Sequence, residues 1–386
     1  MKKLLITLLI LLAYTAGAAA APLDSNAIGQ QLLDTLSTDN VNQFISKINS
    51  ELNEDIPLLN GDILKDIAGK GLTFNWQTVW QTFIARLFRE LSTNLHLMGK
   101  LVFLAVLCAL LQNLQNSFEH SGISLLAYSL CYIFLVVIVL NAMFGALTLA
   151  SQTVANMVGF MEALLPLLIS LLAGVGALTS ASLFTPLMLF VVNTISVVVK
   201  DAVLPLLFLT AVLECVNNLS DKYHLSNLSG LFKQAGMVVL GFAMVAFIGM
   251  ITIQGVTGSV ADGVTLRTAK FATATFIPVV GKMLADTVEV VMGASLLLKN
   301  AIGIFGVVAI FMICAFPVIK LLALILVIKI AGALVQPMGD EKMAKCLDAM
   351  GNNLLLIFGA VITVAVMFFL AITMIIGVGS AAMMLR

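Results

Sequence analysis

Ionisable side chains gather in one stretch of a chain whose other apolar segments carry almost none. The stretch VTLRTAKFATATFIPVVGKMLADTVEVV runs from residue 264 to residue 291 and holds Arg267, Lys270, Lys282, Asp286 and Glu289. On a helix, the last three are four and three residues apart, so they share one face and Lys282 can pair with Asp286. The chemistry that these residues offer is charge pairing or the lining of a polar path.

Residues 264–299 admit three placements. The segment is a bent amphipathic hairpin in the membrane interface, a re-entrant segment whose ions face an internal polar path, or an extramembrane connector. Charged groups at membrane depth are costly unless they face a cavity or a partner, and Pro278 interrupts the helix. Periodicity alone does not separate the first two placements. Glu162 is the matching charge in an earlier, more apolar segment, and we include it among the candidate functional residues.

Groupings typical of catalysis are missing from the sequence. His96, His120 and His224 are scattered, and Ser259 lacks the G-x-S-x-G frame of a nucleophile elbow. Asp340 is expected to be a turn or helix-capping residue. The chain has five cysteines without the spacing of a metal site, and we expect buried free thiols. We therefore predict no enzymatic activity, no metal and no cofactor.

The composition indicates a polytopic membrane protein. Of 386 residues, 61% are hydrophobic and 10% are charged, and the mean hydropathy is +1.09. Soluble domains carry about 25% charged residues. The net charge of zero gives no support for a nucleic-acid partner. The lipid bilayer is thus the first partner that the sequence implies, and the fold class is all-α.

The N-terminus has the features of a secretory signal. Lys2 and Lys3 precede an apolar core, and small residues follow it, so we expect a signal peptide over residues 1–20 that is cleaved after Ala20. The alternative is an uncleaved anchor helix. Residues 21–95 then form a small extracytoplasmic helical region. Its second part, with Trp76 and Trp80, is expected to be an interfacial helix leading into the membrane or a small self-packed helical domain.

Apolar runs predict the membrane helices that follow. Residues 96–150 contain the first two, and GVGALTSAS from Gly174 to Ser182 predicts a sharp turn or a close helix crossing. Two polar loops, at 217–234 and 336–353, carry lysines and are expected to face the cytoplasm. The expected spans are 97–114, 123–149, 163–178, 183–199, 202–216, 237–253, 301–319, 321–335 and 354–376.

The membrane region also repeats itself. Pro166 and Pro278 are 112 residues apart, as are Pro205 and Pro317, and the order of polar and apolar segments around them is similar. We predict an internal duplication, with membrane repeat 1 at 151–256 and membrane repeat 2 at 257–386. Duplicated halves are common in transporters and permeases. We expect the two repeats to be parallel, unless the charged segment is re-entrant.

The block IQGVTGSVADGVTLRTAKFATATFIPVVGKMLADTVEVVMGASLLLKNAIGIFG, from Ile253 to Gly306, resembles the stage III sporulation protein AE family of endospore-forming bacteria. The signal peptide and the later FPVIKLLALILVIKIAGALVQPMGD belong to the same resemblance, which covers essentially the whole chain. The family has no established catalytic residues to assign to this sequence.

This resemblance implies a multi-pass protein of the mother-cell membrane around the forespore. Its partners are other stage III A-type sporulation membrane proteins and, indirectly, a forespore membrane protein. Together they form a channel complex, similar to a specialised secretion or feeding apparatus, that is needed for forespore development. The alternative function is a stand-alone permease or secondary transporter for a small solute.

Overall fold

The computed structural model describes residues 76–117, 122–219, 225–276, 280–338 and 341–384, together with Gln43. All regular structure in these ranges is helical, which confirms the predicted all-α class. The expected signal peptide and most of the region 21–95 lie outside the described residues. The elements are α5 (Trp76–Ser117), α6 (Gly122–Gly174), α7 (Leu178–Val197), the π-helix η1 (Val198–Val203), α8 (Leu204–Leu219), α9 (Ser226–Phe276), α10 (Val280–Val335), the 3-10 turn η2 (Gln336–Met338) and α11 (Glu341–Met384).

Six helical rods in the described ranges are long and apolar enough to cross a membrane. The nine spans expected from the sequence were therefore wrong in number. α6 joins two expected spans, η1 joins α7 to α8 in one rod, and α10 continues through Lys320. Isolated polar residues such as Ser151, Gln152 and Lys320 end an apolar run but are compatible with helical backbone, so a hydropathy boundary is not a helix end.

The rods are unusually long for membrane helices. They contain between 42 residues in α5 and 56 residues in α10. At 1.5 Å per residue these lengths correspond to about 63–84 Å, whereas a bilayer's hydrocarbon core is about 30 Å thick. Each rod is therefore about two to three times as long as one membrane crossing requires.

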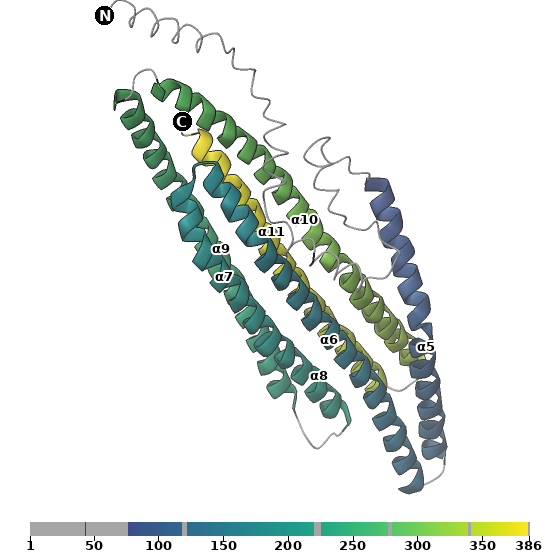
Figure 1. The fold of residues 1–386 in the computed structure, drawn as a ribbon. Coiled ribbons are helices and arrows are strands. Elements are labelled where there is room, and N and C mark those ends of the chain that lie inside the picture. Colours follow the sequence, from purple (N-terminus) through teal and green to yellow (C-terminus); the bar gives the residue numbers. More distant parts are fainter. Residues whose placement is uncertain are drawn as a thin grey trace, which may run out of the picture.

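The rods lie roughly side by side in an elongated bundle (Figure 1). α11 packs most extensively against α10 and also contacts α6, α8 and α9, while α5 packs against α10 and α6. α9 and α10 touch only briefly and diverge to opposite sides of the bundle. Fully buried Phe160, Phe305 and Phe368, from α6, α10 and α11, mark the core.

The two ends of the bundle differ in their connections. At one end α8 ends, α9 begins, α10 ends and α11 begins, and we call this the loop end (Figure 1). At the other end α6 meets α7 and α9 approaches α10, and we call this the hairpin end. The ends of α8 and α10 therefore lie on the same side, as the parallel arrangement of the expected repeats requires.

The sharp turn predicted in the Gly174–Ser182 stretch is confirmed. α6 ends at Gly174 and α7 begins at Leu178, and between them Gly176 has a φ angle of 90°. This left-handed conformation is unfavourable for residues with a Cβ atom. Glycine at position 176 therefore allows two long helices to reverse direction within three residues.

The proline pairs of the expected duplication have partly equivalent places. Pro205 is the second residue of α8, and Pro317 lies inside α10, so both occur in rods that run toward the loop end. Pro166 lies inside α6, whereas Pro278 falls in the gap 277–279, outside the described residues. The duplication and its boundaries remain a prediction.

The shared loop end makes the topology testable. In a background with all five native cysteines replaced, Ser226→Cys and Glu341→Cys should both react with a membrane-impermeant maleimide from the same side of the membrane. Both positions are exposed, at the starts of α9 and α11. Leu178→Cys at the hairpin end is the control that should not react from that side. Labelling of the first two positions from opposite sides would contradict the arrangement.

Candidate functional site

Lys329, Asp348 and Asn352 form a closed polar network near the loop end. The Lys329 Nζ donates to Asp348 Oδ1 at 2.5 Å and to Asn352 Oδ1 at 2.7 Å. Asn352 Nδ2 in turn donates to Asp348 Oδ2 at 3.0 Å. Because each member satisfies another, this network holds α10 and α11 together without leaving a free charge.

A cavity of about 600 Å³ lies beside this network, between α8, α9, α10 and α11. Glu214 on its wall accepts a hydrogen bond from Asn353 Nδ2 at 2.6 Å, and Glu341 pairs with Lys345 at 2.7 Å. Charges of both signs line the cavity, so it suits water and polar solutes better than ions of one sign. The charged and amide residues on its wall are Glu214, Lys233, Lys329, Gln336, Glu341, Lys345, Asp348 and Asn352.

Beneath the cavity, two thiols and a phenol connect three helices. The Sγ atoms of Cys215 in α8 and Cys346 in α11 are 2.8 Å apart. Tyr132 of α6 donates its Oη hydrogen to the Cys215 carbonyl oxygen at 3.3 Å. All three side chains are buried, and both cysteines are free thiols. Cys108 and Cys314 are also buried, and Cys131 is half-buried.

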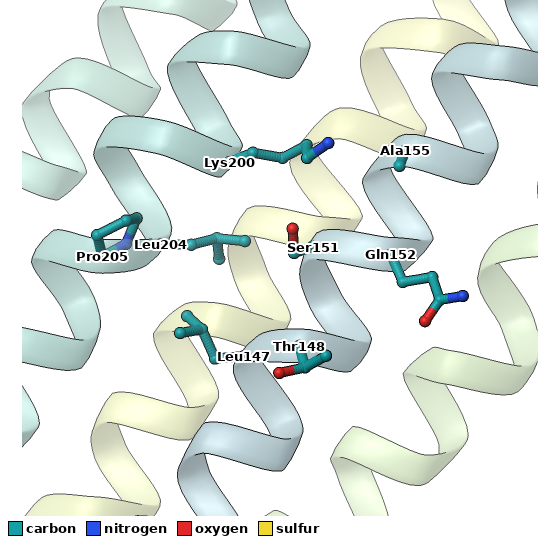
Figure 2. A pocket seen from close by; sticks show the side chains of 8 residues that line it. All are labelled: Leu147, Thr148, Ser151, Gln152, Ala155, Lys200, Leu204 and Pro205. Atoms are coloured by element: carbon teal, nitrogen blue, oxygen red, sulfur yellow. The ribbon is translucent and has the colours of Figure 1, made fainter.

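A second cavity, of about 320 Å³, opens between α6 and the junction of η1 with α8. Figure 2 shows the Lys200 side chain extending from η1 toward α6, with the Ser151 hydroxyl pointing into the same space. Thr148 and Gln152 add polar groups, and Leu147, Ala155, Leu204 and Pro205 complete the lining. Within the described ranges, Lys200 has neither an ion pair nor a hydrogen bond.

The π-helix has a local cause. Leu204 donates its backbone N–H to the carbonyl of Val199, five residues back, and Pro205 has no N–H to donate. The wider turn leaves a carbonyl group of the preceding turn without its helical partner. Single π-turns of this kind are frequent at functional sites, and here the turn carries Lys200 to the cavity.

Charged residues on other rods lie at a similar distance from the loop end. Lys200 is 19 residues before Leu219 at the end of α8, and Phe316 is 19 residues before Val335 at the end of α10. These spacings put both about 28 Å from the loop end, close to one hydrocarbon thickness. Arg86 of α5 stacks over the Phe316 ring at 5.7 Å from its centroid and pairs with Glu90. We call this set the polar belt: Arg86, Glu90, Lys200, Asp201 and Lys320.

Lys299 of α10 is the one fully buried lysine in the described ranges. Its Nζ donates to the backbone carbonyl of Ile376 in α11 at 2.8 Å. No carboxylate of the described residues pairs with it, and the neighbouring Asn300 Oδ1 is buried without a hydrogen-bond partner. A buried cation without an anion costs several kcal/mol, so its presence points to a function rather than to stability.

Asp262 of α9 caps the start of α7. Its Oδ1 accepts the Thr179 N–H at 2.8 Å, and its Oδ2 accepts the Ser180 N–H at 3.2 Å. Ala177, at the N-cap position, makes no side-chain cap, so the carboxylate supplies it from another helix. Gly258 allows this approach, because a Cβ atom there would collide with the Ser180 hydroxyl.

The structure places the predicted candidate residues in two regions. Glu162 is exposed on α6, away from the others. Arg267 is exposed near the end of α9, with Lys270 close by on the same helix. Lys282, Asp286 and Glu289 lie in the first three turns of α10, so the charges flank the gap 277–279 at the hairpin end, and the side chains of Lys270 and of these three lie outside the described residues.

Sequence reasoning did not single out Lys200, Lys299, Asp262 or Glu214 as site residues. Lys299 is an isolated charge and Lys200 is next to Asp201, and both lysines lie beside long apolar runs, which was the signal available for them. Within the described residues, no group of three or more His, Cys, Asp or Glu side chains is placed to hold a metal ion. The interior polar groups described above form hydrogen bonds and an ion pair between helices.

Comparisons with known proteins agree on one family. The family model described as "Stage III sporulation protein AE" matches residues 60–379, which include nearly all of α5 to α11. The protein of that name from Bacillus subtilis (strain 168) is 37% identical over 375 residues, covering 96% of this chain and 94% of the relative. The description names a sporulation protein and no enzymatic activity. No solved structure matches the chain.

Proposed function

From the premise that the chain belongs to the stage III sporulation protein AE family and so has a role in sporulation, we propose that it is a membrane component of the channel complex between mother cell and forespore. Its six long apolar rods make it a multi-pass membrane protein. We place it in the mother-cell membrane around the forespore, with other stage III A-type membrane proteins as its partners.

The observation that supports a complex over a stand-alone permease is the apolar surface beyond one bilayer. If the polar belt lies at one membrane face and the loop end at the other, the hairpin half of the bundle projects outside the bilayer. That half exposes large apolar side chains, including Phe190 at 66%, Leu297 at 57% and Phe311 at 52%. Large apolar side chains exposed to water outside a bilayer favour burial against another surface, so we expect partner proteins to cover them.

The loop-end cavity provides a polar opening for such a complex. Lysines concentrate at that end, with Lys233 near the start of α9, Lys329 near the end of α10, and Lys342 and Lys345 in the first turns of α11. The positive-inside tendency therefore puts the cavity on the mother-cell cytoplasmic side. A mixed-charge cavity there suits the passage of polar solutes into the complex, with no reaction at the site.

A matched pair of variants tests the proposal in sporulating cells. Phe190→Ser, in the hairpin half of α7, should leave the protein level unchanged but reduce co-purification of other stage III A-type proteins and the yield of spores. Phe242→Ser, at 74% exposure on the part of α9 between the loop end and the polar belt, should have little effect. If neither variant changes co-purification or spore yield, the proposal that partner proteins cover the hairpin half is wrong.

Reconstitution distinguishes the alternative function. Purified chain alone in liposomes should transport no small solute, whereas the isolated complex should be visible by electron microscopy with this chain inside it. Solute uptake by the chain alone, together with no stage III A-type partners after purification, would instead establish a stand-alone permease.

A further inference from the structure

We propose that the Lys200 cavity binds the phosphate group of an anionic phospholipid. The lining of this cavity combines a lysine amine, two hydroxyl groups and a side-chain amide with apolar side chains from the same two rods. This mixed composition suits an amphiphile with a charged head and an apolar body. The proposal stands independently of the sporulation function.

The amine needs an anion that the described part of the chain does not supply. Lys200 is half-buried and makes no ion pair or hydrogen bond there, while Asp201, its exposed neighbour, does not line the cavity. A lysine beside apolar surface is stabilised by an opposite charge or by access to water. A bound phosphate oxygen provides the opposite charge.

The cavity is also built to hold a ligand rather than only a counter-ion. Its volume of about 320 Å³ is at the lower end of the range of roughly 300–1,000 Å³ for small-molecule sites. Ser151 lines the same cavity as Lys200, and its hydroxyl group points into that space and can donate its hydrogen (Figure 2). Thr148 already donates to the Phe144 carbonyl at 3.0 Å, so its oxygen serves as an acceptor or as packing surface. The donors for a phosphate are therefore Lys200 and Ser151, since the Gln152 amide extends away from Lys200 (Figure 2).

Position and surroundings favour a lipid as the source of this phosphate. Lys200 lies about 28 Å from the loop end, which is the distance between the headgroup layers on the two sides of a hydrocarbon core. Val197, about one turn before Lys200, and Leu209, about two and a half turns after it, are 58% and 46% exposed and suit contact with acyl chains. Anionic headgroups are attracted to basic side chains at the membrane surface.

Lipid retention by the full-length protein tests the proposal. Wild-type chain, reconstituted in vesicles of equal phosphatidylglycerol and phosphatidylcholine and then extracted in mild detergent, should retain phosphatidylglycerol preferentially by mass spectrometry. Lys200→Gln should lower that retention at least about tenfold, the loss expected when a charge-assisted hydrogen bond is removed. Lys200→Arg should keep most of it. The control Lys320→Gln removes an exposed belt lysine that lines neither described cavity and should retain the lipid.

Three results would overturn the proposal. Equal retention of phosphatidylglycerol by wild type and Lys200→Gln would show that the amine does not hold the lipid. Stabilisation of detergent-solubilised wild type by inorganic phosphate alone, with no preference among lipids, would assign the cavity to free phosphate. Unchanged lipid retention with loss of a co-purifying protein in Lys200→Gln would assign Lys200 to a partner's carboxylate.

Discussion

Lys299→Met is expected to leave the bundle folded and to abolish spore formation. The lysine is fully buried, and its amine has only the Ile376 carbonyl as a partner among the described residues. Methionine fills a similar volume without a charge. Replacement of buried charges by apolar residues is neutral or stabilising by about 1–4 kcal/mol, so the unfolding temperature should stay at or above that of wild type.

The reason to expect a functional loss is that the fold maintains Lys299 at a cost. A buried amine that serves neither an ion pair nor exposed solvation is a candidate for contact with solute or for a change of protonation during passage. Stability is measured as thermal unfolding, which is monitored by the reaction of the newly exposed thiols with a fluorogenic maleimide. Counts of heat-resistant spores report on function. A methionine variant that unfolds at a lower temperature yet sporulates normally would make Lys299 a structural residue.

Asp262→Ala is expected to cause the largest loss of stability. It removes the acceptor for the half-buried Thr179 N–H and the buried Ser180 N–H of α7, and a negative charge at a helix N-terminus. Together these changes should destabilise the bundle by about 2–5 kcal/mol. The same thiol-reaction assay should show a lower unfolding temperature, and the protein level in cells should fall.

Two variants control this expectation. Asp262→Asn keeps an oxygen acceptor and loses only the charge, so it should recover a substantial part of the stability. Asp201→Ala removes an acid that is exposed on the π-helix and makes no hydrogen bond in the described ranges, so it should change stability by no more than about 0.5 kcal/mol. If the Asp262→Ala variant has the same unfolding temperature as wild type, α7 needs no cap from α9.

Hydropathy was sufficient for the fold class but not for the number of helices. Uncharged apolar runs predicted an all-α membrane bundle, and the Gly174–Ser182 stretch predicted the turn that Gly176 makes. The breaks expected near Val199 and Ile319 were wrong because Lys200 and Lys320 change polarity without ending the rod. Near Lys200 the backbone forms a π-turn before Pro205 and the rod continues, and near Lys320 α10 continues as an α-helix.

The interior sites depend on contacts that one sequence does not reveal. Asp262 and Thr179 are 83 residues apart, and Glu214 and Asn353 are 139 apart, so neither pair forms a local pattern. Lys200 and Lys299 are the same residue type beside similar apolar runs, yet one lines an open cavity and the other is fully buried. Helical periodicity placed Lys282 and Asp286 on one face, and their pairing remains a prediction.

The shared side of the two polar connections has an evolutionary consequence. Between the end of α8 and the start of α11 the chain runs to the hairpin end and back, through α9 and α10. A gene segment that encodes such a round trip can be copied in tandem without turning the new copy over. The copy inherits lysines that already face the correct compartment, whereas a segment with a single crossing would need its charges redistributed before it could insert. The predicted duplication therefore implies a short mutational route from an ancestor with one such unit to the present chain.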